Sequence, residues 1–349
     1  MERIGRISGV AVLAAFLAAA ASGEEKMKPS DDFPQRSLTN GLVKLKLYLP
    51  AGEKGYYFGS RFEPSGVVAR AEYKGHTFFG PWKQRDPNSQ DSIMGTAEEF
   101  SMDDPPGFDE VEAGGVFYKI GVGELVRKEK PVKNKQTGKM EPQPYGFWRG
   151  HKVARRAPWR QTHGKDWVQF VQEFTGKRGW GWHYTKRVSL AKGAPSFTIF
   201  RRLENTGTKA IDTTHYCHNF TLIDNEPIGP NYEVRLPFNA RAKQIKGDAA
   251  EVRDRQVVFL KPLLRSKSVW IEMEGMMGTA LDNAVVIENR KTGASLKITG
   301  DRPVVTYRFW AAPLAACPEP FVAVKVAPRA TITWSNTYTF HVRQVPKPK

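Results

Sequence analysis

The chain has 349 residues and is strongly basic, with 53 lysines and arginines against 36 aspartates and glutamates and a formal net charge of +17. Its two cysteines, Cys217 and Cys317, exclude a disulfide-dense scaffold and a multi-cysteine metal site. The charge suits acidic polysaccharides, envelope polymers or anionic lipid surfaces as partners, and it also suits a merely solvated cationic surface.

The first residues predict export. A short basic segment is followed by an uncharged run over residues 7–21 and by small residues before Glu24. This is the pattern of a secretory signal peptide, which we place at residues 1–23. The alternative is a membrane anchor, but a spanning helix needs roughly 20 apolar residues. We therefore expect a secreted or periplasmic protein with no transmembrane segment, for which nucleic acid is not a partner.

The mature chain reads as short strands separated by Gly, Pro, Asn and Asp, and no helical apolar pattern persists for a dozen residues. The expected strands are 43–47, 67–73, 116–125, 167–172, 182–190, 197–204, 232–238, 257–260, 268–272, 284–288, 295–298, 304–310, 321–326 and 331–334. This pattern predicts an all-β fold, a large antiparallel β-sandwich formed as one domain by residues 24–349. Residues 127–144 are rich in Lys and Pro and are expected to form an exposed insertion loop.

Two phrases late in the chain carry the candidate chemistry. The strand-like stretch 214–220 contains His218, and Glu319 lies between Pro318 and Pro320. A histidine and a carboxylate on rigid strands are the minimum needed to place one proton on a substrate while removing another. The two prolines fix the backbone around Glu319 and remove the ladder donors on either side of it.

The order and spacing of these phrases resemble the galactose mutarotase-like (aldose 1-epimerase-like) superfamily. There, a strand reading L-x-N-x-G … H-x-F carries the general acid histidine, and a glutamate near the C-terminus is the general base. The other segments that carry the resemblance are 59–68, 95–100, 121–125, 205–207 and 326–340. The resemblance implies the mutarotase-like supersandwich fold, with His218 as the acid and Glu319 as the base.

The chain departs from that family at the H-G-x-x-R motif, which supplies a second histidine to the substrate. Glu98 and Glu99 occupy its place in the order, and His163-Gly164 comes too late to fill it. The chain is therefore more similar to an uncharacterised secreted branch than to a housekeeping mutarotase. Gly121-Val122-Gly123 lacks the context of a dinucleotide site. We expect no cofactor and no metal.

Mutarotation opens an aldose at its anomeric carbon and closes it from the other face. In the implied chemistry, Glu319 removes the proton of the anomeric hydroxyl while His218 protonates the ring oxygen, and both steps then reverse. The alternative for His218 is a core histidine bonded to backbone, and for Glu319 it is a surface carboxylate. If both act on one sugar, their side chains should lie within roughly 5–8 Å of each other in one open cleft that Arg61 also reaches.

Further residues are candidates for substrate binding, each with a structural alternative. Arg61 could hold a sugar hydroxyl or a uronic carboxylate, or form a buried ion pair. Only one of Glu98 and Glu99 can face the cleft if both lie on a strand, and one of them could pair with Arg61. Trp180 and Trp182 could stack on a sugar ring or pack in the core. Asp224 and Tyr232, which follow the His218 strand, could line the cleft.

Strand parity bears on the two thiols. Cys217 points to the face opposite His218, whereas Cys317 shares the face of Glu319, so a disulfide between them is disfavoured if His218 and Glu319 meet. We expect two small buried thiols.

Two classes of function remain open beside the epimerase. One is a non-catalytic module that binds an acidic polysaccharide. The other is a polysaccharide lyase or hydrolase on the same sandwich. The partner in every case is a monosaccharide or a polysaccharide.

Overall fold

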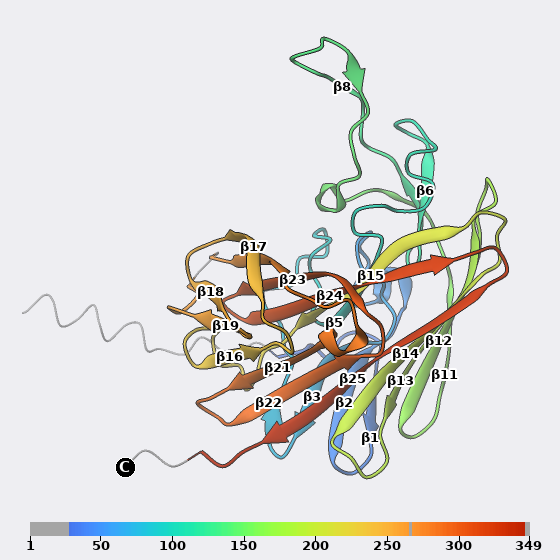
Figure 1. Cartoon of the computed structure of the whole chain (residues 1–349). Coiled ribbons are helices and arrows are strands. Elements are labelled where there is room, and N and C mark those ends of the chain that lie inside the picture. The colour runs from blue at the N-terminus through green and yellow to red at the C-terminus, as the bar shows by residue number, and fades with distance from the viewer. Residues whose placement is uncertain (1–27, 265–266, 346–349) are drawn as a thin grey trace, which may run out of the picture.

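A computed structural model describes residues 28–264 and 267–345, so the predicted signal peptide at 1–23 lies outside the described residues. In the described part the chain forms strands and three 3-10 turns, η1 (Gly52–Lys54), η2 (Phe147–Arg149) and η3 (Ala280–Asp282). The strands pair antiparallel, and the prediction of an all-β sandwich is confirmed (Figure 1). No helix in this part of the chain is long and apolar enough to cross a membrane.

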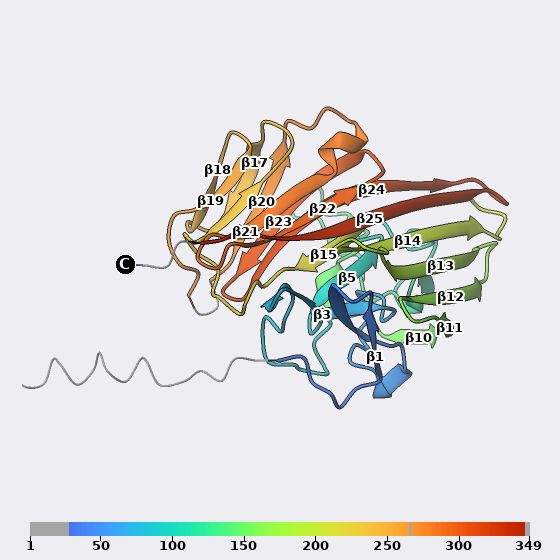
Figure 2. The same cartoon turned by 90° about the horizontal axis from the view of Figure 1, so that it is seen from below.

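Two large sheets dominate the molecule (Figure 2). The ten-stranded sheet runs in the order β11 (Trp159–His163), β12 (Trp167–Thr175), β13 (Gly181–Leu190), β14 (Ser196–Asn205), β25 (Thr331–Val342), β22 (Ala294–Gly300), β21 (Ala284–Asn289), β16 (Tyr232–Arg235), β19 (Gln256–Phe259) and β18 (Ala250–Arg253). The six-stranded sheet runs in the order β17 (Arg241–Lys246), β20 (Val269–Glu274), β23 (Val304–Ala312), β24 (Ala315–Val326), β15 (Ile211–Phe220) and β5 (Gly95–Phe100).

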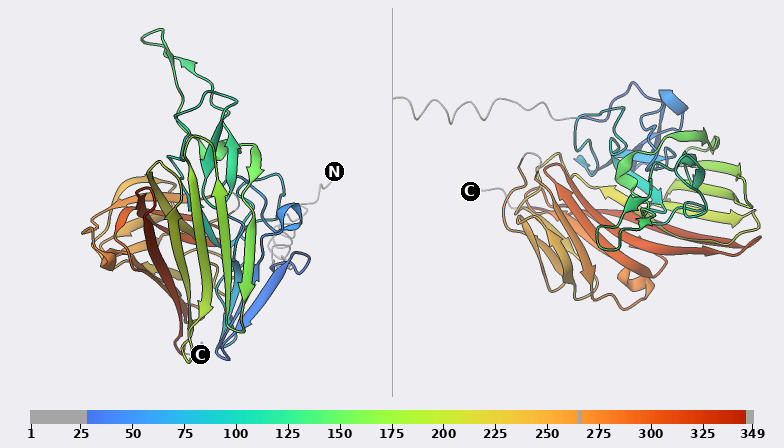
Figure 3. Two further views of the ribbon diagram at one scale, coloured as in Figure 1. Left: turned by 90° about the vertical axis from the view of Figure 1, so that its right-hand side faces the viewer. Right: turned by 90° about the horizontal axis from the view of Figure 1, so that it is seen from above.

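Three smaller sheets complete the fold. The N-terminal one has the order β1 (Gln35–Thr39), β2 (Val43–Tyr48), β3 (Val67–Tyr73) and β4 (His76–Thr77). Another contains β10 (Val153–Arg156), β7 (Gly123–Val126) and β6 (Val116–Lys119), and a two-stranded hairpin pairs β8 (Val132–Lys133) with β9 (Met140–Glu141). The β8–β9 hairpin projects away from the body of the molecule (Figure 3).

Two sequence predictions need correction. The single strand expected over 116–125 is the hairpin of β6 and β7, because Gly121 and Gly123 adopt φ values of +84° and +132° and end the extended run. The insertion at 127–144 is exposed over most of its length, but it contains the β8–β9 hairpin, and its first residues are anchored, with Arg127 and Glu129 buried.

The main core lies between the sheets and is built by alternation. In β12, β13 and β14 every second side chain is buried, which is the pattern that made these strands recognisable in the sequence. The largest cluster of buried apolar residues draws on the ten-stranded, six-stranded and N-terminal sheets together. One continuous core therefore joins these three sheets.

A buried ionic cluster crosses this interior. Glu98 on β5 bonds Arg201 on β14, and its other oxygen lies 3.0 Å from Nζ of Lys186 on β13. Lys186 also bonds Oε1 of Glu63 at 2.7 Å. Burial raises the pKa of Glu98, but the neighbouring Arg201 and Lys186 outweigh it and hold that pKa well below its usual value. These ions join the two large sheets, and removal of one partner leaves the other charge buried without compensation.

His215 lies beside this cluster and is buried. Burial, assisted by the positive charge of Arg201, lowers the pKa of His215 to about 4, although Glu98 opposes the shift. Its Nδ1 accepts a hydrogen bond from Nε1 of Trp334 at 3.2 Å. His215 is therefore neutral in the folded protein near neutral pH, and its role is structural.

We expect Glu98→Gln to destabilise the protein by about 3–5 kcal/mol, because it leaves the buried Arg201 without its carboxylate and Lys186 with Glu63 alone. Glu173→Gln is the matched control, since Glu173 pairs with Arg160 on an exposed surface. Urea unfolding followed by tryptophan fluorescence measures both. Equal and small effects would mean that the cluster does not hold the sheets together.

The pKa of His215 also predicts how stability depends on pH. The unfolded chain takes up a proton below about pH 6.5 and the folded chain only below about 4. The contribution of the neutral imidazole is therefore complete above pH 6.5 and is lost as pH falls towards 4, by about 3 kcal/mol in all. Unfolding free energies at pH 7.5 and 4.5 should differ more for the wild type than for His215→Gln. Parallel losses in both proteins would contradict this assignment.

Candidate active site

The floor of the candidate site is set by the register between β15 and β24. His215 pairs with Val322, and continuation of this register places His218 directly opposite Glu319. On the far side of β24, Arg308 of β23 is the partner of Glu319. Directly opposed residues share a face, so these polar side chains form one row across the sheet.

The prolines beside Glu319 explain how a polar pair is held in the middle of a sheet. Pro318 and Pro320 have no N–H, so part of the ladder to β15 has no backbone donor. The side chain of Asn219 fills this gap, because its Nδ2 donates to the carbonyl oxygens of Pro318 and Cys217, each at 3.0 Å. Its amide oxygen accepts a hydrogen bond from Tyr338 at 2.8 Å. Asn219 thus fixes β24 against β15 beside the candidate catalytic pair.

His218 and Glu319 meet in one pocket. Nε2 of His218 lies 2.9 Å from Oε1 of Glu319, closer than the 5–8 Å expected for two groups that flank a sugar. Both side chains are largely buried, with exposed fractions of 7% and 3%, yet both line the pocket. Nδ1 of His218 has no hydrogen-bond partner among the described residues. The two side chains are therefore in direct contact in this structure, and their remaining surface faces the pocket.

The pocket encloses about 260 Å³. Its floor comes from β15, β20, β23 and β24, and its walls come from the loops before β3, β5 and β10 and from the loop after β5. The residues that line it are Arg61, Trp82, Lys83, Asp91, Met102, Phe147, His218, Phe220, Trp270, Trp310 and Glu319. This volume is just below the range of drug-sized sites and fits one small ligand.

Aromatic rings build most of the wall. Phe220 stacks on the His218 imidazole with ring centres 4.1 Å apart, and Trp82 stacks on the other side of Phe220 at 5.6 Å. Trp310 meets His218 and Trp82 edge to face, and Trp270 is its cross-strand neighbour. An apolar aromatic wall around a carboxylate and an imidazole is the composition typical of small-ligand sites.

Arg61 reaches the pocket, and it is also the centre of an ion-pair network. Its Nε donates to Glu99 at 2.8 Å, its Nη1 to Asp91 at 2.6 Å and its Nη2 to the hydroxyl of Tyr216 at 3.0 Å. Burial raises the pKa of Glu99, but Lys119 and Arg61 outweigh it, so the pKa lies below its usual value. The alternative of a buried ion pair therefore holds for Arg61, which keeps only one free N–H on each terminal nitrogen.

Glu98 and Glu99 lie on opposite faces of β5, as parity predicted, but neither lines the pocket. Glu99 lies on the face of β5 beneath the pocket, while Glu98 points into the interior and lies outside the site. The prediction of two buried free thiols is also confirmed for Cys217 and Cys317. No group of three or more His, Cys, Asp or Glu side chains suited to a metal occurs within residues 28–264 and 267–345.

Besides Glu98 and Glu99, four further predicted substrate contacts do not line the pocket. Trp182 is buried and stacks on Phe174, so packing in the core describes it, and Trp180 lies beside Glu110 on the far end of the sheet. The hydroxyl of Tyr232 bonds the backbone of Ile223. Asp224 accepts hydrogen bonds from His76 and from the backbone N–H of Thr77, and so it fixes a turn.

The aromatic wall was missed because it depends on pairings that are remote in sequence. A signal existed for Trp310: the Pro313–Leu314 turn makes β23 and β24 a hairpin, which sets Arg308 against Glu319 and Trp310 one pleat away. The loop residues Trp82 and Asp91 gave no such signal, because a loop has no period that fixes the direction of a side chain.

Solved structures show the fold family. No protein-family model and no curated protein matches the sequence. The Slr1438 protein of Synechocystis sp. PCC 6803 matches with a TM-score of 0.54 and 12% identity over 90% of this chain and 97% of its own. A galactose mutarotase related enzyme of Lactobacillus acidophilus matches with a TM-score of 0.53 and 12% identity over 89% and 100%. A candidate aldose 1-epimerase of Escherichia coli K12 matches with a TM-score of 0.50 and 13% identity over 88% and 99%. The chain therefore has a galactose mutarotase-like fold.

Tyr216 tests the network under the pocket. Its hydroxyl donates to Glu99 at 2.6 Å and accepts from Arg61, so we expect Tyr216→Phe to cost about 1–3 kcal/mol of stability by leaving buried charged groups short of a partner. Tyr73→Phe is the control, because the Tyr73 hydroxyl makes no hydrogen bond with any described residue. Thermal unfolding of the two variants measures the difference, and an equal effect would remove the structural role assigned to Tyr216.

Proposed function

We propose that the pocket over β15 and β24 binds a sugar, and that the protein interconverts sugar anomers as an aldose 1-epimerase-type isomerase. The observation that carries this proposal is the contact between Glu319 and His218 at the floor of an aromatic pocket in a mutarotase-like fold. The fold by itself names no reaction, and the argument for catalysis is the chemistry of this pair.

The pocket suits one sugar ring. A pyranose has apolar faces of C–H groups and a rim of hydroxyls, which match aromatic rings such as Trp310 and Trp82 and a few polar groups. Lys83 lies over the Trp82 ring and, among the described residues, its ammonium has a single hydrogen bond, to Ser89 at 3.3 Å. Lys83 and Asp91 can thus take sugar hydroxyls at the rim.

In the proposed mechanism, the sugar places its anomeric hydroxyl against Glu319 and its ring oxygen against His218. The Glu319 carboxylate takes the hydroxyl proton, and the electron pair of that O–H bond forms the carbonyl. The bond between C1 and the ring oxygen breaks, and the protonated imidazole of His218 gives its proton to that oxygen. Rotation about the C1–C2 bond followed by the reverse steps yields the other anomer and restores both groups.

The direct contact between the two catalytic groups is replaced by contacts with the substrate in this mechanism. Anomeric and ring oxygens are attached to the same carbon, so they can replace a single short contact by two hydrogen bonds with little movement of either strand. Asn219 and the flanking prolines hold the backbone in place meanwhile, so only side-chain rotation is needed.

We also propose that the protein acts outside the cytoplasm. The support is the basic, apolar and small-residue pattern of residues 1–23, which is typical of a signal peptide. Sugars released from extracellular or envelope polymers would then be its substrates.

A second candidate is a sugar-binding protein without catalysis. It is favoured by the 2.9 Å contact, because a histidine and a glutamate held against each other can offer a sugar fixed hydrogen-bonding groups without moving a proton. The two candidates share the pocket and differ only in whether a proton moves.

Polarimetry of freshly dissolved α-anomers of several hexoses separates them. We expect the wild type to accelerate mutarotation of at least one sugar, and Glu319→Gln and His218→Gln each to lower kcat/KM by about 10²–10⁴-fold. The control is His163→Gln, since His163 lies exposed on β11. Absence of acceleration with every sugar, or full activity in Glu319→Gln, would refute the isomerase. Sugar binding that survives in the inactive protein would then leave the second candidate.

A further inference from the structure

A second and larger hollow lies beside the candidate pocket. It encloses about 760 Å³, within the usual range for ligand sites. Asp91 lines both hollows, and the chain segments around Ser60, Gln90 and Trp148 in the larger one continue into the wall of the pocket at Arg61, Asp91 and Phe147. The Arg61–Asp91 ion pair thus forms the divide between them.

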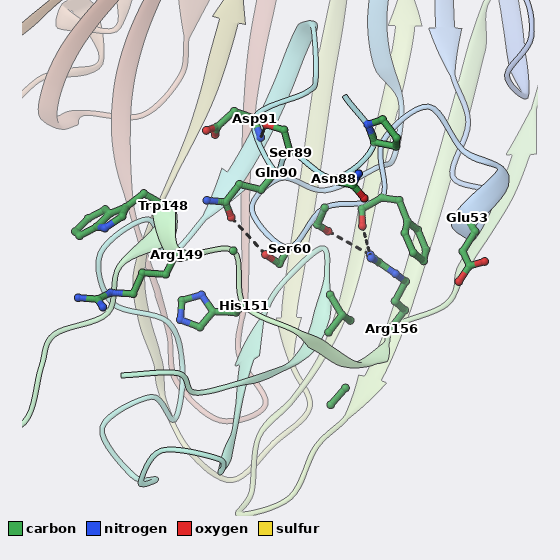
Figure 4. Close-up of a pocket in the computed structure, with 16 residues that line it drawn as sticks. Glu53, Ser60, Asn88, Ser89, Gln90, Asp91, Trp148, Arg149, His151 and Arg156 are labelled. Carbon is green, nitrogen blue, oxygen red and sulfur yellow. Dashed lines mark hydrogen bonds between the residues drawn. The ribbon is translucent and has the colours of Figure 1, made fainter. Parts of the chain in front are cut away.

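Arg156 on β10 gives this hollow its chemistry. Its guanidinium donates to the carbonyl oxygens of Phe58 and Gly59 and lies 3.6 Å from the centre of the Phe58 ring (Figure 4). These contacts use two of its five N–H groups. No carboxylate of the described residues lies within ion-pair distance of it, and burial lowers its pKa, although Tyr57 and Glu53 act in the opposite direction.

The other charges of the hollow are balanced or solvated. Asp91 is paired with Arg61, and Arg149 lies 3.4 Å from Glu129, which also bonds His151. Glu53 is exposed at the rim. The half-buried guanidinium of Arg156 is consequently the one charge in the described lining that is both withdrawn from water and without an ionic partner, and a bound anion would supply what it lacks.

Trp148 adds a surface for a sugar ring. It is 63% exposed, on a turn at the edge of the hollow, although exposed tryptophans are uncommon. In Figure 4, Trp148 and Arg149 lie on the opposite side of the hollow from Arg156. An aromatic face, a guanidinium and the amide and hydroxyl groups of Gln90 and Ser60 are together suited to an acidic sugar.

We propose that this hollow is a subsite for an acidic sugar unit, a uronate held at its carboxylate by Arg156, so that the natural ligand is the end of an acidic oligosaccharide. The proposal rests on the proposed function, because the terminal unit of the same ligand occupies the pocket over His218 and Glu319. The net charge of +17 favours the approach of such a polyanion from a distance.

Calorimetry with trimers of galacturonate, glucuronate and mannuronate, each beside its uncharged methyl ester, tests this subsite. We expect at least one acidic trimer to bind the wild type about tenfold or more tighter than its ester, since a charge-assisted bidentate contact is worth that much. Arg156→Gln should abolish this preference, Arg156→Lys should keep part of it, and Arg160→Gln, which removes an exposed arginine, should change nothing.

Trp148→Ala provides a second test of the subsite, and it leaves the hydrogen bonds of Arg156 to the carbonyl oxygens of Phe58 and Gly59 undisturbed. It should weaken acidic and esterified trimers alike while leaving monosaccharide binding unchanged. The subsite is refuted if no acidic trimer binds tighter than its ester, or if the preference persists in Arg156→Gln. If the wild type prefers an acidic trimer but accelerates mutarotation of no sugar, the isomerase is refuted and the subsite is supported.

Discussion

The register between β15 and β24 is the constraint on which the candidate site depends. A shift of this register by one residue would send His218 and Glu319 to opposite faces of the six-stranded sheet. A one-residue shift of β5 against β15 would in the same way bring Glu98 rather than Glu99 beneath the pocket. The register between β15 and β24 is unusual because two prolines interrupt its backbone ladder in a central strand. The side-chain amide of Asn219 donates to the Pro318 carbonyl where the prolines cannot donate to β15. The backbone on either side of Glu319 is therefore fixed although the ladder is interrupted there.

Two buried ion-pair clusters, one on each face of β5, stabilise this arrangement. On the inner face of β5, Glu98 binds the cations of β13 and β14 and so joins the two large sheets. On the outer face, Glu99 binds Arg61 and Lys119 and so holds the loops that wall the pocket. Adjacent residues of one strand thus serve the core and the site separately. Glu98 and Glu99 both serve as partners of buried cations, and neither lines the pocket, where the second histidine of the resembling family would be needed.

Much of the fold was predictable because its strands carry their own signal. Alternating burial in β12 to β14 and the buried runs of β15 and β24 are properties of local sequence. The pair His218 and Glu319 was predictable because each lies in a recognisable phrase. Trp182 and Tyr232 were misplaced because aromatic residues in a large sandwich are mostly core, and Trp82, Asp91 and Arg156 were missed because only the folded chain brings their loops and edges together.

The central claim is that a sugar ring binds over the row of His218 and Glu319 between the aromatic walls. Crystals of the protein soaked with the hexoses and uronates that fit a single ring test it most directly. The account predicts a ring in contact with Trp310 or Trp82, with its anomeric hydroxyl within about 2.6–3.2 Å of Glu319 and its ring oxygen within that distance of His218. The two side chains, which lie 2.9 Å apart in this structure, should then have moved apart. A sugar bound with its anomeric carbon away from this pair, or bound only on another face of the sandwich, would contradict it.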